Sequence, residues 1–117
     1  VEQVIGDVTD IESLHKTIPD HVEAIFHTAA DTSLWARNNA RQNIINVHGA
    51  ANIVEAARKK HAKRLIHTSS IGAYGKTGVD PITEETPSNA MTSGINYFQS
   101  KYLAEQEVKK GVSLGLD

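Results

Sequence analysis

Three stretches rich in apolar and β-branched residues alternate with three segments of helical pattern, and this alternation restricts the fold more than any other feature. The expected strands cover residues 1–6, 22–30 and 64–70. The expected helices cover residues 9–18, about 35–60 and 96 to about 110. Strands that alternate with helices are typical of an α/β protein with a parallel sheet. The sequence therefore predicts such a sheet, in the order strand, helix, strand, helix, strand, helix.

Two local patterns set the details of the expected helices. Thr9 is followed three residues later by Glu12, which predicts a capping box with Thr9 at the start of the first helix. In the central helix, apolar residues recur at helical spacing. They are Val47, Ala50, Ala51 and Val54. Such a stripe predicts the face that packs against the sheet.

Composition excludes several classes of protein. The chain has 117 residues, 39% of them hydrophobic, which suits one globular domain and excludes disorder of the whole chain. Its formal charge of -2 gives no basic excess for a phosphate backbone, so we expect no nucleic-acid partner. The chain has no cysteine and its six histidines lack ligand spacing, so we expect no metal site. No apolar run approaches the roughly 18 residues of a membrane span, so we expect a cytoplasmic protein with no membrane partner.

Tyr97 and Lys101 stand four residues apart on the last expected helix, so their side chains share one face. One interpretation is purely structural, with a half-buried tyrosine and a lysine whose charged end reaches water. Two features favour a catalytic interpretation. Ser70 ends the last strand, at the edge of a parallel sheet where open α/β proteins bind ligands. The segment from Ser70 to residue 96 is also long for a plain connection, and such segments usually bind or catalyse.

A serine, a tyrosine and a lysine at one sheet edge form an acid–base set. Free tyrosine has a pKa of about 10, and a nearby ammonium lowers this pKa because it stabilises the phenolate. Tyr97 would then exchange a proton with a hydroxyl or carbonyl oxygen, while Ser70 holds that oxygen by a hydrogen bond. We therefore predict Ser70, Tyr97 and Lys101 as catalytic residues, with Ser70 and Tyr97 also in contact with substrate.

Six segments, in order along the chain, carry a resemblance to a known family. They are residues 6–10 (GDVTD), 26–30 (FHTAA), 46–50 (NVHGA), 68–75 (TSSIGAYG), 83–87 (TEETP) and 96–101 (NYFQSK). With these segments the chain resembles the extended short-chain dehydrogenases/reductases, over nearly its whole length. This family includes nucleotide-sugar epimerases and dehydratases and dihydroflavonol-reductase-like enzymes. Residues 27–35 favour the branch of the dihydroflavonol-reductase-like enzymes and related sugar epimerases. The resemblance implies a Rossmann-like, doubly wound parallel sheet, of which the chain holds the middle part.

The resemblance also implies a cofactor, NAD or NADP, and the residues that hold it. The implied contacts are Asp7, Val8, Thr28, Ala29, Ala30, Asn46, Thr68, Tyr97 and Lys101. Asp7 would lie at the adenine, Lys101 would hold the nicotinamide ribose, and Thr32 would reach the substrate. Some of these residues also have a plain structural interpretation, because an Asp is common in turns and Asn46 could fill a gap between helix and sheet.

The family resemblance leads to a concrete expectation for the reaction. Hydride moves between the nicotinamide and a secondary alcohol or ketone of a nucleotide-sugar or dihydroflavonol-like substrate, with Tyr97 as general acid/base. Residues 1–117 are expected to be a single partial NAD(P)-binding domain, because the family's glycine-rich strand–turn–helix and its C-terminal substrate part have no counterpart in this sequence. The resemblance further implies a homodimer through the two long helices.

Two other interpretations stay open at this point. The protein could be a non-catalytic dinucleotide-binding sensor, although such a sensor has no need of Ser70, Tyr97 and Lys101 together. Alternatively, the 117 residues could be an inactive fragment that only self-associates through an unpaired strand edge.

Overall fold

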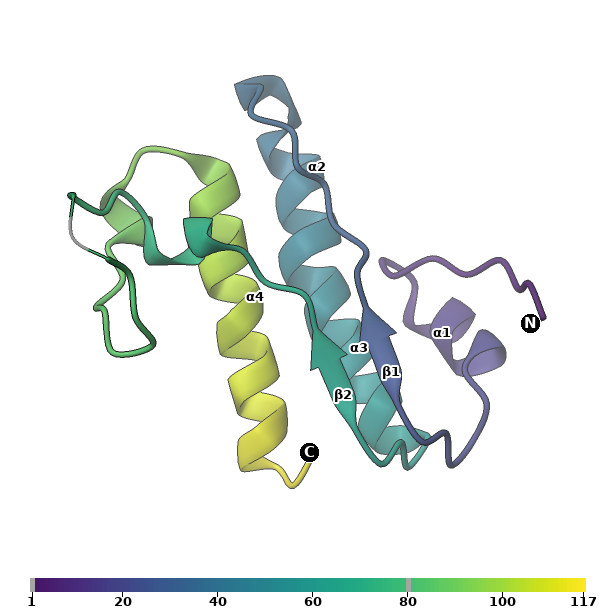
Figure 1. The fold of residues 1–117 in the computed structure, drawn as a ribbon. Helices are drawn as coiled ribbons and strands as arrows, with labels where there is room; N and C mark the ends of the chain where they lie inside the picture. The colour runs from purple at the N-terminus through teal and green to yellow at the C-terminus, as the bar shows by residue number, and fades with distance from the viewer. Residues whose placement is uncertain (1, 80) are drawn as a thin grey trace.

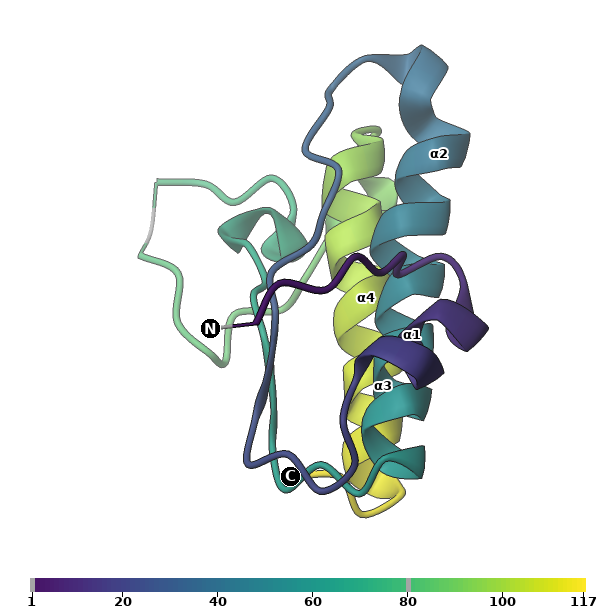
Figure 2. The same ribbon diagram turned by 90° about the vertical axis from the view of Figure 1, so that its right-hand side faces the viewer.

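Two short parallel strands with helices behind them form the centre of the fold. The computed structural model describes residues 2–79 and 81–117. Strands β1 (Ile25–His27) and β2 (Leu65–His67) pair in parallel, with Ile25 opposite Leu65 and His27 opposite His67. The long helices lie behind one face of this pair (Figures 1 and 2). On the other face, 71% of the Phe26 surface is exposed. The predicted α/β fold with a parallel sheet is thus confirmed.

The helices follow the expected order along the chain. They are α1 (Ile11–Thr17), the 3₁₀ turn η1 (Ala36–Asn38), α2 (Asn39–Asn43), the π-helical turn η2 (Ile44–His48), α3 (Gly49–Lys59) and α4 (Asn96–Ser113). The N-cap of α1 is Asp10, whose carboxylate accepts a hydrogen bond from the Glu12 backbone N–H at 3.0 Å. The prediction of Thr9 as the cap is therefore wrong. Aspartate caps a helix as well as threonine does, and the Thr9 hydroxyl is already bonded to Asp7 at 2.8 Å.

The predicted apolar stripe of the central helix is only half right. Ala50 and Val54 are buried, whereas Val47 and Ala51 are half-exposed on the flank of the helix. The other buried apolar side chains of α3 are Ile53, Ala56 and Ala57. The buried face is therefore rotated from the predicted stripe, which leaves Val47 and Ala51 at its edge.

The predicted strand at residues 1–6 is not found. Residue 1 lies outside the described residues, and residues 2–6 form no strand. A strand needs a neighbour to share its backbone hydrogen bonds, and β1 and β2 pair with each other rather than with residues 2–6. The same reason explains why β1 and β2 are shorter than the stretches from which they were predicted.

The apolar core lies between α3 and its neighbours. One cluster, of Leu14, Ile53 and Ala56, joins α1 to α3, and Leu65 of β2 packs against it. A second cluster joins α3 to the chain end through Val54, Ala57 and Leu116. Ala56 and Ala57 have no exposed surface, which lets the helix approach its neighbours closely.

The long segment after β2 is mostly irregular, as predicted, with two short 3₁₀ turns. These are η3 (Ile71–Tyr74) and η4 (Ala90–Thr92). Gly75 ends η3 with φ = 88°, and a Cβ at this position would lie 2.1 Å from the Asn89 side-chain oxygen. Asn89 in turn bonds both the N–H and the carbonyl of Lys76 at 2.8 Å. The segment is therefore folded back on itself next to the start of α4.

Within residues 2–79 and 81–117, none of the helices combines the length and the apolar character that a membrane crossing requires.

Candidate functional site

Lys101 is a buried cation bonded to the end of β2. Only 4% of its surface is exposed, and its ammonium Nζ donates a hydrogen bond to the Thr68 carbonyl oxygen at 2.7 Å. Thr68 follows directly after β2 and donates its own N–H to the His27 carbonyl at 3.0 Å. Lys101 therefore ties α4 to the carboxyl edge of the strand pair, where an α/β protein binds its ligands.

The charge of Lys101 lies in a poorly solvated environment. Burial lowers the pKa of its ammonium below the ordinary value, and the Glu105 carboxylate partly opposes this shift. His27 and His67 lie opposite each other in the strand pair, with ring centroids 5.1 Å apart. Burial lowers the pKa of each imidazole to about 4, and the nearby positive charge of Lys101 adds to both shifts. Near neutral pH, both imidazoles are therefore uncharged.

Ser70 caps the turn that leads away from β2. Its hydroxyl oxygen accepts a hydrogen bond from the Gly72 N–H at 3.1 Å, which leaves the hydroxyl hydrogen free to donate. The turn packs on α4 so tightly that a Cβ on Gly72 would lie 2.6 Å from the Phe98 ring. The turn that Ser70 caps therefore lies against Phe98, the residue that follows Tyr97.

Tyr97 lies one turn before Lys101 on α4 and is half-buried. It lines a cavity of about 230 Å³. The other lining residues are Ser33, Leu34, Ala36, Asn39, Gly94, Ile95, Asn96 and Phe98. Neither Ser70 nor Lys101 is among them. Lys101 is bonded at the end of β2, Ser70 lies two residues after Thr68, and Tyr97 lines this separate cavity.

Two buried amides hold the segment that follows β1. The Asn46 side chain accepts from the Asp31 N–H at 2.7 Å and donates to the Asp31 carbonyl at 3.0 Å and to Ser100 at 2.9 Å. Gln42 donates to the carbonyls of Asp31 and Ser33. Thr32, the predicted substrate contact, lies exposed between these two anchored residues. Asn46 thus has a clear structural role at the site, in addition to the predicted contact with cofactor.

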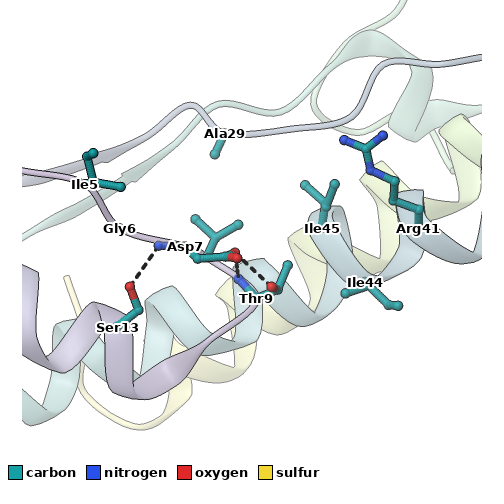
Figure 3. Close-up of a pocket in the computed structure, with 10 residues that line it drawn as sticks. Ile5, Gly6, Asp7, Thr9, Ser13, Ala29, Arg41, Ile44 and Ile45 are labelled. Atoms are coloured by element: carbon teal, nitrogen blue, oxygen red, sulfur yellow. Dashed lines mark hydrogen bonds between the residues drawn. The ribbon is translucent and has the colours of Figure 1, made fainter.

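A larger cavity, of about 690 Å³, lies between the segment before α1, the end of β1 and the central helix (Figure 3). Three predicted cofactor contacts, Asp7, Val8 and Ala29, line it together. The Thr9 N–H and hydroxyl donate to the Asp7 carboxylate at 2.8 Å each, and these bonds lower the pKa of that carboxyl group. Thr28 and Ala30 flank Ala29 and are exposed, but neither lines this cavity.

Several residues of the site were not predicted. Arg41, Ile44 and Ile45 supply the helical wall of the larger cavity. Gln42 had a usable signal, since it precedes Asn46 by four residues and so shares its helix face. Arg41 had no comparable signal, because an arginine in a helix is most often a solvated side chain.

Residues 2–113 match the NAD dependent epimerase/dehydratase family. The chain belongs to this family. A relative from Synechocystis whose name refers to dihydroflavonol 4-reductase is 34% identical over 118 residues, which cover 100% of this chain and 34% of the relative. The chain thus spans about a third of the length of that relative.

Two solved structures extend the comparison to the fold. RMD from Pseudomonas aeruginosa, complexed with NADPH, has a TM-score of 0.83 at 26% identity and covers 97% of this chain and 40% of its own. A short-chain dehydrogenase/reductase superfamily protein from Agrobacterium tumefaciens with bound NAD has a TM-score of 0.81 at 27% identity, over 93% of this chain and 33% of its own. The family resemblance and the Rossmann-like fold are thereby confirmed. The predicted cofactor class, NAD or NADP, agrees with the description of the family as NAD dependent and with the cofactors bound in these two structures.

Proposed function

We propose that the full-length protein is an NAD(P)-dependent oxidoreductase or epimerase that acts on a secondary alcohol or ketone. The observation that carries this proposal is the buried ammonium of Lys101, fixed at the end of β2 one helical turn from Tyr97. A buried charge is costly, and a helix that keeps one at a ligand-binding edge points to chemistry there. Tyr97 is the proposed general acid/base, and Ser70 the proposed donor to the reacting oxygen.

The larger cavity fits part of a dinucleotide. Its volume of about 690 Å³ lies within the range of ligand pockets, about 300–1,000 Å³. The Asp7 carboxylate is exposed there and is kept ionised by its bonds to Thr9, so it can accept hydrogen bonds from an amino group such as that of adenine. Val8 and Ala29 offer the apolar surface that a flat base requires.

The residues of this chain have distinct tasks in the proposed reaction. When bound, NAD(P) supplies the carbon that gives or takes the hydride. Tyr97 gives a proton to the carbonyl oxygen during reduction, or takes one from the hydroxyl during oxidation. The Lys101 ammonium stabilises the phenolate left on Tyr97, because an opposite charge nearby favours the charged form. The free hydroxyl hydrogen of Ser70 holds the same substrate oxygen.

The substrate class is proposed from the wall of the smaller cavity. This wall carries both apolar side chains, such as Leu34 and Phe98, and polar ones, such as Asn39. We therefore propose a substrate of the nucleotide-sugar or dihydroflavonol type, in which a polar ring carries the reacting carbon.

Cofactor binding and turnover test the proposal directly. Nicotinamide fluorescence with the full-length protein should show saturable binding of NADH or NADPH, and a panel of nucleotide sugars and dihydroflavonols should include one compound that is turned over. Binding of both cofactors without turnover of any compound would favour the non-catalytic sensor. No binding of either would contradict the proposal as a whole.

A further inference from the structure

Glu105 lies one turn after Lys101 on α4 and is bonded to the same strand end. The Ser69 hydroxyl donates a hydrogen bond to one Glu105 carboxylate oxygen at 2.5 Å. The other oxygen lies 4.0 Å from the exposed ammonium of Lys109. Ser69 directly follows Thr68, whose carbonyl accepts from Lys101. Two consecutive residues of the β2 end thus hold two consecutive turns of α4.

The groups around Lys101 differ in how far they stabilise its positive charge. The Thr68 carbonyl is neutral, and His27 and His67, on β1 and β2, are uncharged near neutral pH. Of the groups that shift the Lys101 pKa, Glu105 is the one that raises it. A carboxylate at this place therefore offsets part of the cost of burying the ammonium.

Tyr97 is half-buried one turn before Lys101, and the other titratable side chains of the elements packed on α4 lie around Glu105 or are exposed, as Arg41 on α2 and His48 on η2 are. Glu105 shares a cavity of about 260 Å³ between α4 and the folded segment after β2. The titratable residues in its lining are Tyr74, Glu84, Tyr102 and Lys109. On α3, the charged residues are exposed; they are Glu55, Arg58 and Lys59. Glu105 is thus both the carboxylate nearest in sequence to Lys101 and one fixed by a serine.

We propose that Glu105, held in place by Ser69, is a positioning residue that keeps Lys101 protonated and thereby sets the upper pH limit at which Tyr97 can exchange protons. The inference rests on the proposed function in one respect, the role of Lys101 beside Tyr97. The charge state of Lys101 itself can be measured without any reaction.

The test is a pH titration of Lys101 in the full-length protein, followed by NMR of ¹³C-labelled lysine side chains, with the signal assigned through Lys101→Arg. Glu105→Gln keeps an oxygen for the Ser69 hydroxyl but removes the negative charge. The midpoint for Lys101 should fall by on the order of one pH unit in this variant. Glu107→Gln is the matched control, because Glu107 lies on the same helix and pairs with Lys110 at the surface. Its midpoint should equal that of the wild type.

Ser69→Ala tests the positioning role and covers the case in which Glu105→Gln does not fold. It should lower the Lys101 midpoint in the same direction by a smaller amount, because Glu105 keeps its charge but loses its anchor. Equal midpoints in wild type, Glu105→Gln and Ser69→Ala would overturn the inference, as would an equal fall in Glu107→Gln.

Activity provides a separate readout. With a compound that is turned over, the high-pH limb of kcat/KM should move to lower pH in Glu105→Gln, because Lys101 then loses its proton earlier. A shifted limb supports the inference, and an unshifted one contradicts it. The titration needs neither cofactor nor substrate. If the protein bound no cofactor, the proposed function would be refuted, but the titration would still test the effect of Glu105 on Lys101.

Discussion

At the scale of single residues, the end of β2 concentrates groups that are costly to bury. Lys101 and His27 each have only 4% of their surface exposed. His67 lies directly opposite His27 in the strand pair. Buried side-chain nitrogens without a partner include both ring nitrogens of His67. A fold seldom keeps such groups together for stability alone, so their presence at the ligand edge agrees with a chemical role there.

The buried imidazoles predict a loss of stability in acid. Their pKa is about 4 in the folded protein and near 6.5 when unfolded, so the unfolded state binds more protons between these values. The free energy of unfolding should therefore fall as the pH falls from about 6.5 to 4, by on the order of 1–2 kcal/mol for each histidine after solvent screening. Thermal unfolding of the full-length protein across this range measures the effect.

Two variants separate these histidines from the other titrating groups. His67→Phe removes one of the two imidazoles and should weaken the dependence on pH. His48→Gln changes an exposed histidine on η2 and should keep the wild-type dependence. The same slope in wild type and His67→Phe would show that the buried pair is not responsible.

At the scale of elements, the central helix positions the site through an irregularity. The π turn η2 contains Asn46, and Gln42 lies in the α2 turn before it. Both amides are buried and both bond to Asp31, so the helix fixes the segment that carries Thr32. π turns are frequent at functional sites.

Removal of the Asn46 amide should loosen this segment. Asn46→Ala leaves the Asp31 N–H without its acceptor and removes the amide that donates to the Ser100 hydroxyl oxygen. A buried polar group left unpaired costs about 1–3 kcal/mol. Chemical unfolding should report a loss of that size, and the KM for substrate should rise. Glu55→Ala, on the exposed side of α3, should change neither. A loss below about 0.5 kcal/mol in Asn46→Ala would contradict the anchoring role.

The order of elements could be predicted from the sequence, while their boundaries could not. Apolar periodicity found α1, α3, α4, β1 and β2, because burial imposes the same spacing on sequence and structure. It found a strand at residues 1–6 as well, because an apolar stretch does not reveal whether a neighbouring strand exists. The π turn was not predicted, because apolar periodicity carries no signal for it, nor for the bonds that its Asn46 makes to Asp31 and Ser100.

The sequence was enough to predict which types of residue occur at the site. It was less informative about how these residues are arranged. Lys101 bonds the Thr68 carbonyl at the end of β2, and Ser70 follows two residues later with a hydrogen bond from Gly72, while their joint role in a site stays a prediction. Glu105 was not predicted, although it follows Lys101 by four residues, because a glutamate on a helix most often faces water. Only the hydrogen bond from Ser69 distinguishes it.

At the scale of the whole molecule, one helical face has no partner within the described residues. Val47 and Ala51 are half-exposed on the outer side of the central helix. Figure 1 shows that α3 and α4 run side by side, so their outer faces form one surface. We propose that the full-length protein forms a homodimer through this surface.

A charge on this surface should separate the dimer. Ala51→Glu places a carboxylate where two copies would meet, and an unpaired charge in an interface is costly. Sedimentation should show the mass of a dimer for the wild type and of a monomer for Ala51→Glu, at equal thermal stability of the monomer fold. A monomeric wild type, or a dimeric Ala51→Glu, would contradict this interface.

The central claim is that the phenol of Tyr97 transfers the proton. The most direct measurement is the single-turnover rate of hydride transfer in full-length Tyr97→Phe, with the affinity for NADH or NADPH determined alongside. The account predicts a rate lower by on the order of 10²–10⁴-fold with an unchanged fold and cofactor affinity. A rate near that of the wild type would contradict it.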